Sequence, residues 1–404
     1  MKWIKLQHLQ GIFAGIIAMS MISPPLANLL EVLLILGVFF TPSLREKLIK
    51  FATTLDFKIQ FAFIALLLIG FAYPLVEPKT YAASILSWRK ILLLPLGYVL
   101  FSDNPLQKRK VLKYIFYFIL LLTLIGVIHK SQFLPFFKES AIRYQIGTTS
   151  SESMFVAVAL AIVLSSLVQN TNLLGLTKAT ESLLAMYLVG YVALFTTGRS
   201  GYLAMLIVLI FMAFKYLKDQ ENKIGFKTLV GLSLVVGIST ALLMNSKTSA
   251  DRINQAFTEF QLSEKNASEN NVTSIGQRLN FWENTIEMIP HYFLTGAGTG
   301  GFQAAYTEQV KNKTGLQAAI TQDPHNQYLK ILIEQGILGL VLFLYLIARA
   351  LFQPHVADTN YVLGSAVIFI WVVTSCFNAH FTTFMEGTFV WAWMGLMNRY
   401  KTNP

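Results

Sequence analysis

Apolar runs of about twenty residues recur along this chain and are separated mostly by short basic connections. A run of that length crosses the hydrocarbon core of a bilayer as a helix, in which every backbone hydrogen bond is satisfied internally. The composition agrees, because 54% of the 404 residues are hydrophobic and only 13% are charged, whereas soluble domains carry about 25% charged residues. The sequence therefore predicts an all-α polytopic membrane protein.

Counting these runs predicts about twelve transmembrane helices. The first apolar interval is interrupted by Pro24-Pro25 and is predicted to form two spans. These two spans lie within residues 9–40, and the other ten cover approximately residues 59–76, 85–101, 111–128, 154–168, 183–197, 202–214, 228–244, 327–347, 362–376 and 382–397. Lys and Arg concentrate in alternate connections, which places these connections and both termini in the cytoplasm. Arg89 and Lys90, near the outer end of the fourth span, are the exception.

The remaining composition narrows the class of protein further. The net charge of +11 is explained mainly by the cytoplasmic connections, and no recognition motif for nucleic acid accompanies it, so we expect no nucleic-acid partner. The single cysteine, Cys376, excludes an intramolecular disulfide. We expect no cleavable signal peptide, because the first apolar run leads directly into more membrane sequence.

One long polar interval, residues 245–325, separates the ninth and tenth predicted spans. At about eighty residues it is much longer than an ordinary connection, which indicates a functional segment. The sequence is therefore divided into a bundle of spans one to nine (1–244), an outside loop with amphipathic helices (245–325), and spans ten to twelve (326–404).

Two helix starts are predicted inside this loop. Ser274 and Gln277 have the spacing of a capping box, and apolar residues then recur at helical spacing until Pro290. A second start is predicted at Asp323-Pro324, a capping residue followed by proline, with His325 in the first turn.

Arginines gather on the predicted outer face, against the usual charge bias. Arg89, Arg143, Arg199 and Arg278 all lie there, together with His325. A guanidinium group suits phosphate oxygens, and a helix N-terminus also favours anions and disfavours an imidazolium. These residues suggest that arginines hold a diphosphate leaving group while His325 removes a proton from an attacking hydroxyl or orients it.

Other interpretations stay open for these residues. Arg89 and Arg199 are also compatible with side chains that extend to the membrane interface, and Arg278 with a solvated helix residue. The segment TGAGTGGF (295–302) lacks the Lys-Ser/Thr ending of a phosphate-binding loop, so we interpret it as a close-packed turn and expect no ATP site. HNQYL has no further ligand at zinc spacing, so no metal is expected.

Several short motifs together resemble the bacterial O-antigen ligase family. They are TTGRSGYLA after a span, VTSIGQRLNFWE in the long loop, the glycine-rich turn, and HNQYL at the start of the next span. The resemblance implies a GT-C-like glycosyltransferase of lipopolysaccharide biosynthesis in the bacterial inner membrane. Its active site would face the periplasm. Such an enzyme moves a glycan from undecaprenyl diphosphate to lipid A-core, with no cofactor, in contact with membrane lipid.

The resemblance also assigns roles to individual residues. Arg199 in GRSG and Arg278 in IGQRL match positions that the family uses for the diphosphate, and Arg143 in IRYQIGT matches another basic position. His325 in HNQY matches the histidine that activates the acceptor hydroxyl, so the implied catalytic set is His325, Arg278 and Arg199. The absence of the C-terminal soluble region common in protein-glycosylating relatives favours a lipopolysaccharide ligase over them. An O-antigen polymerase of the same superfamily and a transporter of lipid-linked glycans are the alternatives.

Overall fold

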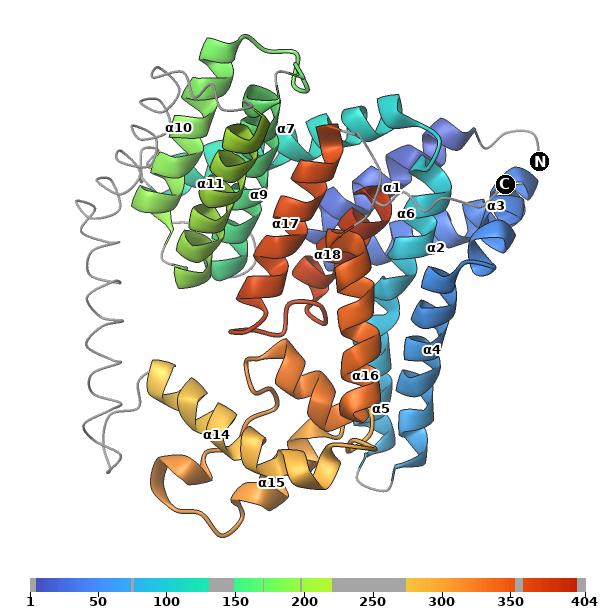
Figure 1. Ribbon diagram of the computed structural model, residues 1–404, viewed down its shortest axis with the longest axis vertical. Coiled ribbons are helices and arrows are strands. Elements are labelled where there is room, and N and C mark those ends of the chain that lie inside the picture. The colour runs from blue at the N-terminus through green and yellow to red at the C-terminus, as the bar shows by residue number, and fades with distance from the viewer. Residues whose placement is uncertain are drawn as a thin grey trace.

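The computed structural model describes residues 5–73, 76–130, 149–169, 171–196, 198–219, 274–352 and 359–397. Every regular element within these ranges is a helix (Figure 1). Six of the described helical stretches are long and apolar enough to cross a membrane, and a seventh crossing results if α2 and α3, bent by 92°, count as one span. The predicted all-α membrane architecture is therefore confirmed for this part of the chain. The count of twelve spans and the GT-C-like arrangement stay predictions, because the predicted ninth span and residues 245–273 lie outside the described residues.

Several N-terminal helices begin at a proline, and α4 begins after Thr54, whose side chain accepts from Phe57 N. Pro24 and Pro25 occupy the first turn of the second helix, so the predicted break in the first apolar interval is confirmed. These helices are α1 (Leu6–Ser20), α2 (Pro24–Phe40), α3 (Pro42–Ala52), α4 (Leu55–Ile69), α5 (Pro78–Trp88), α6 (Leu93–Phe101) and α7 (Pro105–Lys130). Two short 3₁₀ segments, η1 (Gly70–Ala72) and η2 (Arg89–Leu92), follow α4 and α5.

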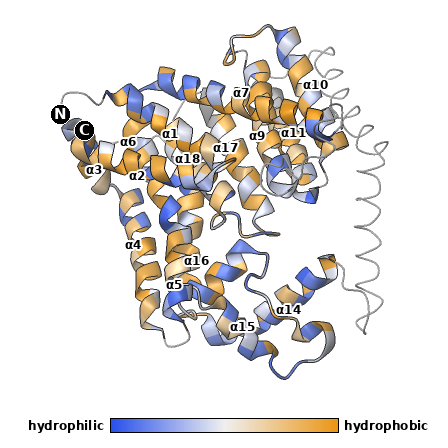
Figure 2. Cartoon of the chain, turned by 180° about the vertical axis from the view of Figure 1, so that it is seen from behind, coloured by the Kyte–Doolittle hydropathy of each residue, from blue (hydrophilic) through white to orange (hydrophobic). Residues whose placement is uncertain are grey.

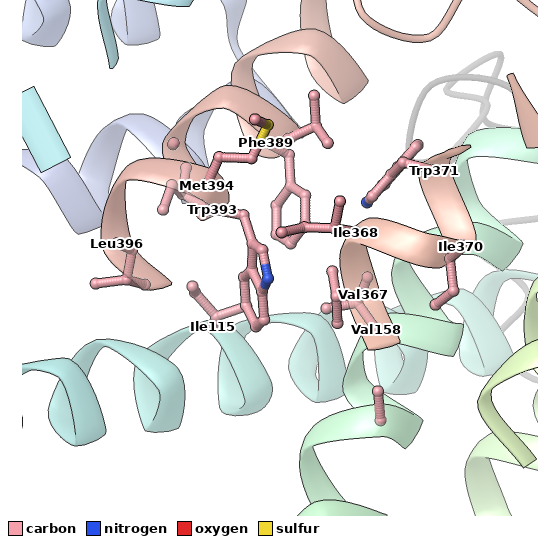
Figure 3. Packing of buried hydrophobic residues seen from close by; sticks show 14 of the residues in the cluster. Ile115, Val158, Val367, Ile368, Ile370, Trp371, Phe389, Trp393, Met394 and Leu396 are labelled. Atoms are coloured by element: carbon pink, nitrogen blue, oxygen red, sulfur yellow. The ribbon is translucent and has the colours of Figure 1, made fainter. Parts of the chain in front are cut away.

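A second group of helices packs around α9 and contains the aromatic centre of the bundle. It consists of α9 (Thr149–Val168), α10 (Lys178–Phe195), α11 (Arg199–Asp219) and α17 (Thr359–Thr374). Helix α18 (Phe384–Met397) packs mainly against α6 and joins this group through α17. Figure 3 shows Trp371 of α17 and Phe389 and Trp393 of α18 packed among aliphatic side chains, including Ile115 and Val158. These large buried rings hold α17 and α18 against α7 and α9, and this packing fixes the connection between α17 and α18.

Helix α16 (Gln327–Leu351) differs from the single straight span predicted over 327–347. It is interrupted at Gly336, whose φ of 66° and ψ of −172° are not helical. Only glycine adopts this conformation without strain, and a Cβ there would lie 2.9 Å from the carbonyl carbon of Leu294. The longer part, after the break, packs beside α4. The shorter part, 327–335, therefore belongs with the loop as much as with the bundle.

The described part of the long loop contains α14 (Ser274–Tyr292), α15 (Phe302–Val310) and the 3₁₀ segment η3 (Gly315–Ala318). The predicted start at Ser274 is confirmed, but the helix continues through Pro290 to Tyr292. Pro290 falls in the last turns, where a single missing N–H does not end the helix. Figure 2 shows that α14 and α15 carry more hydrophilic surface than the bundle. Their own small apolar core is formed by Phe281, Met288, Phe302, Tyr306 and Ile333.

The glycine-rich turn 295–301 joins this loop to the break in α16. Ala297 N donates to Ile333 O at 2.7 Å, and Gly298 N donates to Glu334 O at 2.9 Å. Gly296 and Gly298 have φ values of 73° and 86°. A Cβ at Gly298 would lie 2.9 Å from Gly70 O, so this turn also packs closely against the end of α4. The interpretation as a close-packed turn is confirmed.

Candidate functional site

His325 lies immediately before α16, not in its first turn. Asn326 is the N-cap residue, and its side-chain oxygen accepts from Tyr328 N and Leu329 N. The predicted helix start at Asp323-Pro324 is therefore wrong, and the helix-end argument built on a first-turn position does not apply to His325. Asp323 does cap a donor, but in the loop, where its Oδ1 accepts from His325 N at 2.7 Å.

The backbone of His325 is held in an uncommon conformation. Its φ of 52° lies in the left-handed region, which it shares with only one other non-glycine residue, Asn172, in the described part of the chain. A left-handed non-glycine residue costs about 1–3 kcal/mol, and such strain concentrates at functional sites. The hydrogen bond from His325 N to Asp323 helps to hold the residue in this conformation.

The His325 imidazole lies between the loop and the α17–α18 connection. Its ring stacks on Phe281 of α14 with centroids 6.1 Å apart and an interplanar angle of 28°. Its Nδ1 is 3.4 Å from Asn378 Oδ1. Because a carbonyl oxygen only accepts, a hydrogen bond at this contact requires the tautomer with the proton on Nδ1 and the lone pair on Nε2.

Helix α14 is tied to the same place through Trp282. The indole Nε1 donates to Pro324 O at 2.8 Å, and the ring lies 5.9 Å from that of Phe377. Arg278 precedes Trp282 by four residues, which places both on one face of α14. Arg278 is half-buried. The structure therefore brings the helix that carries Arg278 against the segment that carries His325.

Arg199 is the first residue of α11, directly after the turn made by Gly198. Gly201 N donates to Gly198 O at 2.9 Å, and Tyr202 Oη donates to Thr196 O at 2.9 Å. Gly201 leaves no room for a Cβ, because the side chain of Ser153 in the first turn of α9 occupies that space. The half-buried Arg199 is thus positioned at the point where the first turns of α9 and α11 meet.

Buried polar contacts connect the first turn of α9 with the α17–α18 connection, which contacts His325. Ser151 of α9 donates to Glu386 Oε1 at 2.6 Å, and Glu386 Oε2 lies 3.3 Å from His380 Nδ1. His380 is fully buried and follows Asn378, the partner of His325, by two residues. The first turn of α9 therefore contacts the α11 start that carries Arg199, and also leads to the connection that contacts His325. Convergence of the charged groups on one cavity stays a prediction, and Arg143 lies outside the described residues.

Arg89 was interpreted as a side chain that extends to the membrane interface. In the structure it instead contacts polar and aromatic side chains of the protein. Its guanidinium group donates to Asn28 and lies 3.4 Å from Glu31 Oε2, both on α2. It also lies over the ring of Phe384, with its central carbon 5.9 Å from the ring centroid. Arg89 therefore holds α2 to the α5–α6 segment.

The sequence analysis missed three polar residues of this region: Asn378, His380 and Glu386. Asn378 carries no local signal, because its partner His325 is 53 residues away in the sequence. Glu386 did carry one, since it lies within the predicted span 382–397, and an ionisable residue within an apolar run is costly and usually has a partner. His380 falls in the connection between two predicted spans, where a histidine carries no such signal.

The structure defines a class of protein: a multi-pass helical membrane protein whose loop helices pack against the ends of its spans. Comparison with known proteins agrees with this class. Residues 184–344 match the model of a family described as O-Antigen ligase. The match confirms the resemblance carried by the motifs and supports a member of the O-antigen ligase/polymerase superfamily. Arg199, Arg278 and His325 all lie inside the matched residues.

One curated relative is a protein of Haemophilus influenzae (strain ATCC 51907 / DSM 11121 / KW20 / Rd) described as uncharacterized. It is 29% identical over 158 residues, which are 38% of this chain and 38% of that protein. The similarity therefore spans well under two thirds of the relative's length.

Proposed function

We propose that this protein is an O-antigen ligase that transfers a glycan from undecaprenyl diphosphate to lipid A-core oligosaccharide. The observation that carries the proposal is the geometry of His325 within the matched segment. Its strained backbone is fixed by Asp323, its ring is stacked on Phe281, and its Nδ1 faces Asn378. This arrangement leaves Nε2 as a proton acceptor in a fixed position, which is what a general base needs.

The proposed reaction is an inverting displacement. Nε2 of His325 takes the proton of an acceptor hydroxyl while that oxygen attacks the anomeric carbon of the donor sugar. The bond from the anomeric carbon to the diphosphate oxygen breaks, and the leaving diphosphate keeps the electron pair. Arg199, Arg278 and Arg143 stabilise the charge that develops on it, since guanidinium groups bind phosphate oxygens in a bidentate manner. The imidazolium then returns its proton to solvent.

The direct test is transfer by the purified full-length protein. With a lipid-diphosphate glycan and lipid A-core as substrates, we expect a product on lipid A-core without any added nucleotide. His325→Ala should lower the transfer rate by about 10²–10⁴-fold, the range that general bases contribute. His291→Ala is the matched control, because His291 is an exposed histidine near the end of α14, and it should retain the wild-type rate.

The products decide between the proposed function and its alternatives. Growth of the glycan on its own lipid carrier, with lipid A-core unused, would identify a polymerase. Movement of the lipid-linked glycan across a vesicle membrane without any product would identify a transporter. Wild-type turnover in His325→Ala would refute the role of His325 in any of the transfer reactions.

A further inference from the structure

A small polar cavity of about 250 Å³ lies next to the His325 segment. It is open to one side and is bounded by α5, by the start of α16 with the preceding Asp323, and by the α17–α18 connection. Its polar lining consists of Ser84, Ser87, Asp323, Lys330, Thr382 and Thr383. Four of these six side chains end in a hydroxyl group. The hydroxyls of Ser87, Thr382 and Thr383 donate to the backbone oxygens of Ser84, Ala379 and His380, so toward the cavity they act as acceptors.

The charges around the cavity argue against a phosphate group as its ligand. Lys330 Nζ already lies 3.2 Å from Asp323 Oδ2, and Glu334 follows one turn later, buried to 3% exposure. A dianionic group placed here would face the Asp323 carboxylate at short range, which is unfavourable.

Lys90, behind the cavity, offers no further cation to a ligand. Its ammonium group donates to the backbone oxygens of Ser87, Thr382 and Thr383, each at 3.0 Å. An ammonium group has three N–H donors, and these three bonds use all of them. Lys90 therefore shapes the cavity by fixing its walls, and the ligand-facing charges are the paired Lys330 and Asp323.

The chemistry that fits is a neutral polyol. Each sugar hydroxyl both donates and accepts, so a ring with several hydroxyls can donate to the Ser and Thr oxygens and accept from the Lys330 ammonium group. Bonds from sugar hydroxyls to the carboxylate and the ammonium group are charge-assisted and stronger than neutral ones. At about 250 Å³ the cavity is smaller than the roughly 300–1,000 Å³ of pockets for drug-sized ligands, which suits a single sugar ring.

The cavity and His325 share a residue. The same Asp323 carboxylate accepts from His325 N through Oδ1 and contacts Lys330 through Oδ2. Ala379, which also lines the cavity, directly follows Asn378, the residue that faces the His325 imidazole. A sugar held here would thus contact Asp323, which bonds with His325 N, and would lie beside the residue that follows Asn378.

We propose that this cavity binds the hydroxyl-rich sugar ring of the acceptor and positions it for attack, apart from the arginines that bind the diphosphate of the donor. The assignment to the acceptor rests on the proposed function of His325. It gives Lys330 and Asp323 the role of binding an acceptor sugar.

Filling the cavity from its rim tests this proposal. Ala83 lines the cavity and is exposed on α5, so Ala83→Trp adds bulk without removing an internal contact. Its neighbour Ala82 is equally exposed on α5 and does not line the cavity, so Ala82→Trp is the matched control. We expect Ala83→Trp to raise the acceptor KM at least tenfold while the donor KM and the kcat stay unchanged. Ala82→Trp should leave all three constants unchanged.

A second measurement does not depend on turnover. Tail-free core oligosaccharide is titrated against the full-length protein in nanodiscs and followed by saturation-transfer NMR. Binding to the wild type that is lost in Ala83→Trp but kept in Ala82→Trp supports the cavity, even where no transfer occurs and the proposed function fails. A raised donor KM in Ala83→Trp, or unchanged oligosaccharide binding in that variant, overturns the proposal while leaving the ligase function intact. Absence of binding to the wild type also overturns it.

Discussion

The turn that joins the loop to α16 should tolerate no side chain at Gly296. Its φ of 73° costs a non-glycine residue about 1–2 kcal/mol. An added Cβ would also lie 2.6 Å from the carbonyl carbon of Glu334 and 2.8 Å from Gln335 N, both backbone atoms that a rotamer change cannot move. Forcing them apart adds about 1–3 kcal/mol. Gly296→Ala should therefore destabilise the protein by about 2–5 kcal/mol.

Gly315→Ala separates the two contributions. Gly315 has a similar φ of 60°, but no atom lies within 4 Å of the position that its Cβ would take. This variant should lose only the conformational part, about 1–2 kcal/mol. Thermal unfolding in detergent, followed by tryptophan fluorescence, compares the two variants under one condition. Equal midpoints for Gly296→Ala and Gly315→Ala would refute the argument that close packing at Glu334 fixes the turn.

Three further predictions address the loop and the site. Asn378→Leu should lower transfer up to about tenfold, because one hydrogen bond contributes about 0.5–1.5 kcal/mol, and an unchanged kcat would show that Asn378 does not orient His325. The hydrogen bond from Lys313 holds the pKa of Glu287 below its usual range. The stabilisation by Glu287 is therefore present above the unfolded pKa and is lost as pH falls through the lower folded pKa. Glu287→Gln should lower the unfolding midpoint at pH 7 and match the wild type in strong acid, whereas Glu283→Gln should change neither. In a Cys376→Ser background, Ser274→Cys should react with a membrane-impermeant maleimide in spheroplasts, and labelling only after lysis would place the loop in the cytoplasm.

Most helix positions followed from hydrophobic periodicity, but their ends depended on local capping. The span predicted at 111–128 is observed as Pro105–Lys130. Its start is set by Asn104, whose side chain accepts from Gln107 N, and by proline in the first position. The basic residues that follow, including Lys110, were assigned to a connection because of their charge, although a helix that emerges from the membrane carries them equally well.

The segment around His325 shows what sequence signals alone do not decide. Asp323-Pro324 and Asn326 are both plausible starts, and local propensity does not choose between them. Tertiary contacts make the choice, since Pro324 O accepts from Trp282 and the Asp323 carboxylate bonds with His325 N and Lys330. His325 itself was identified from its motif. Its partner Asn378 was not, because only the packing of α17 and α18 brings that residue near.

The break in α16 makes the glycine-rich turn part of the backbone bonding of this helix. Ile333 O and Glu334 O accept from the turn, and Ile337 N donates to Phe293 O, so three backbone groups of this helix bond outside it. An unsatisfied backbone group in hydrocarbon costs several kcal/mol. The turn precedes α16 in the chain, so it has already been synthesised when these groups reach the bilayer. Residues 293–298 thus supply the backbone partners that the broken helix lacks, and a chain without them would leave these groups unpaired.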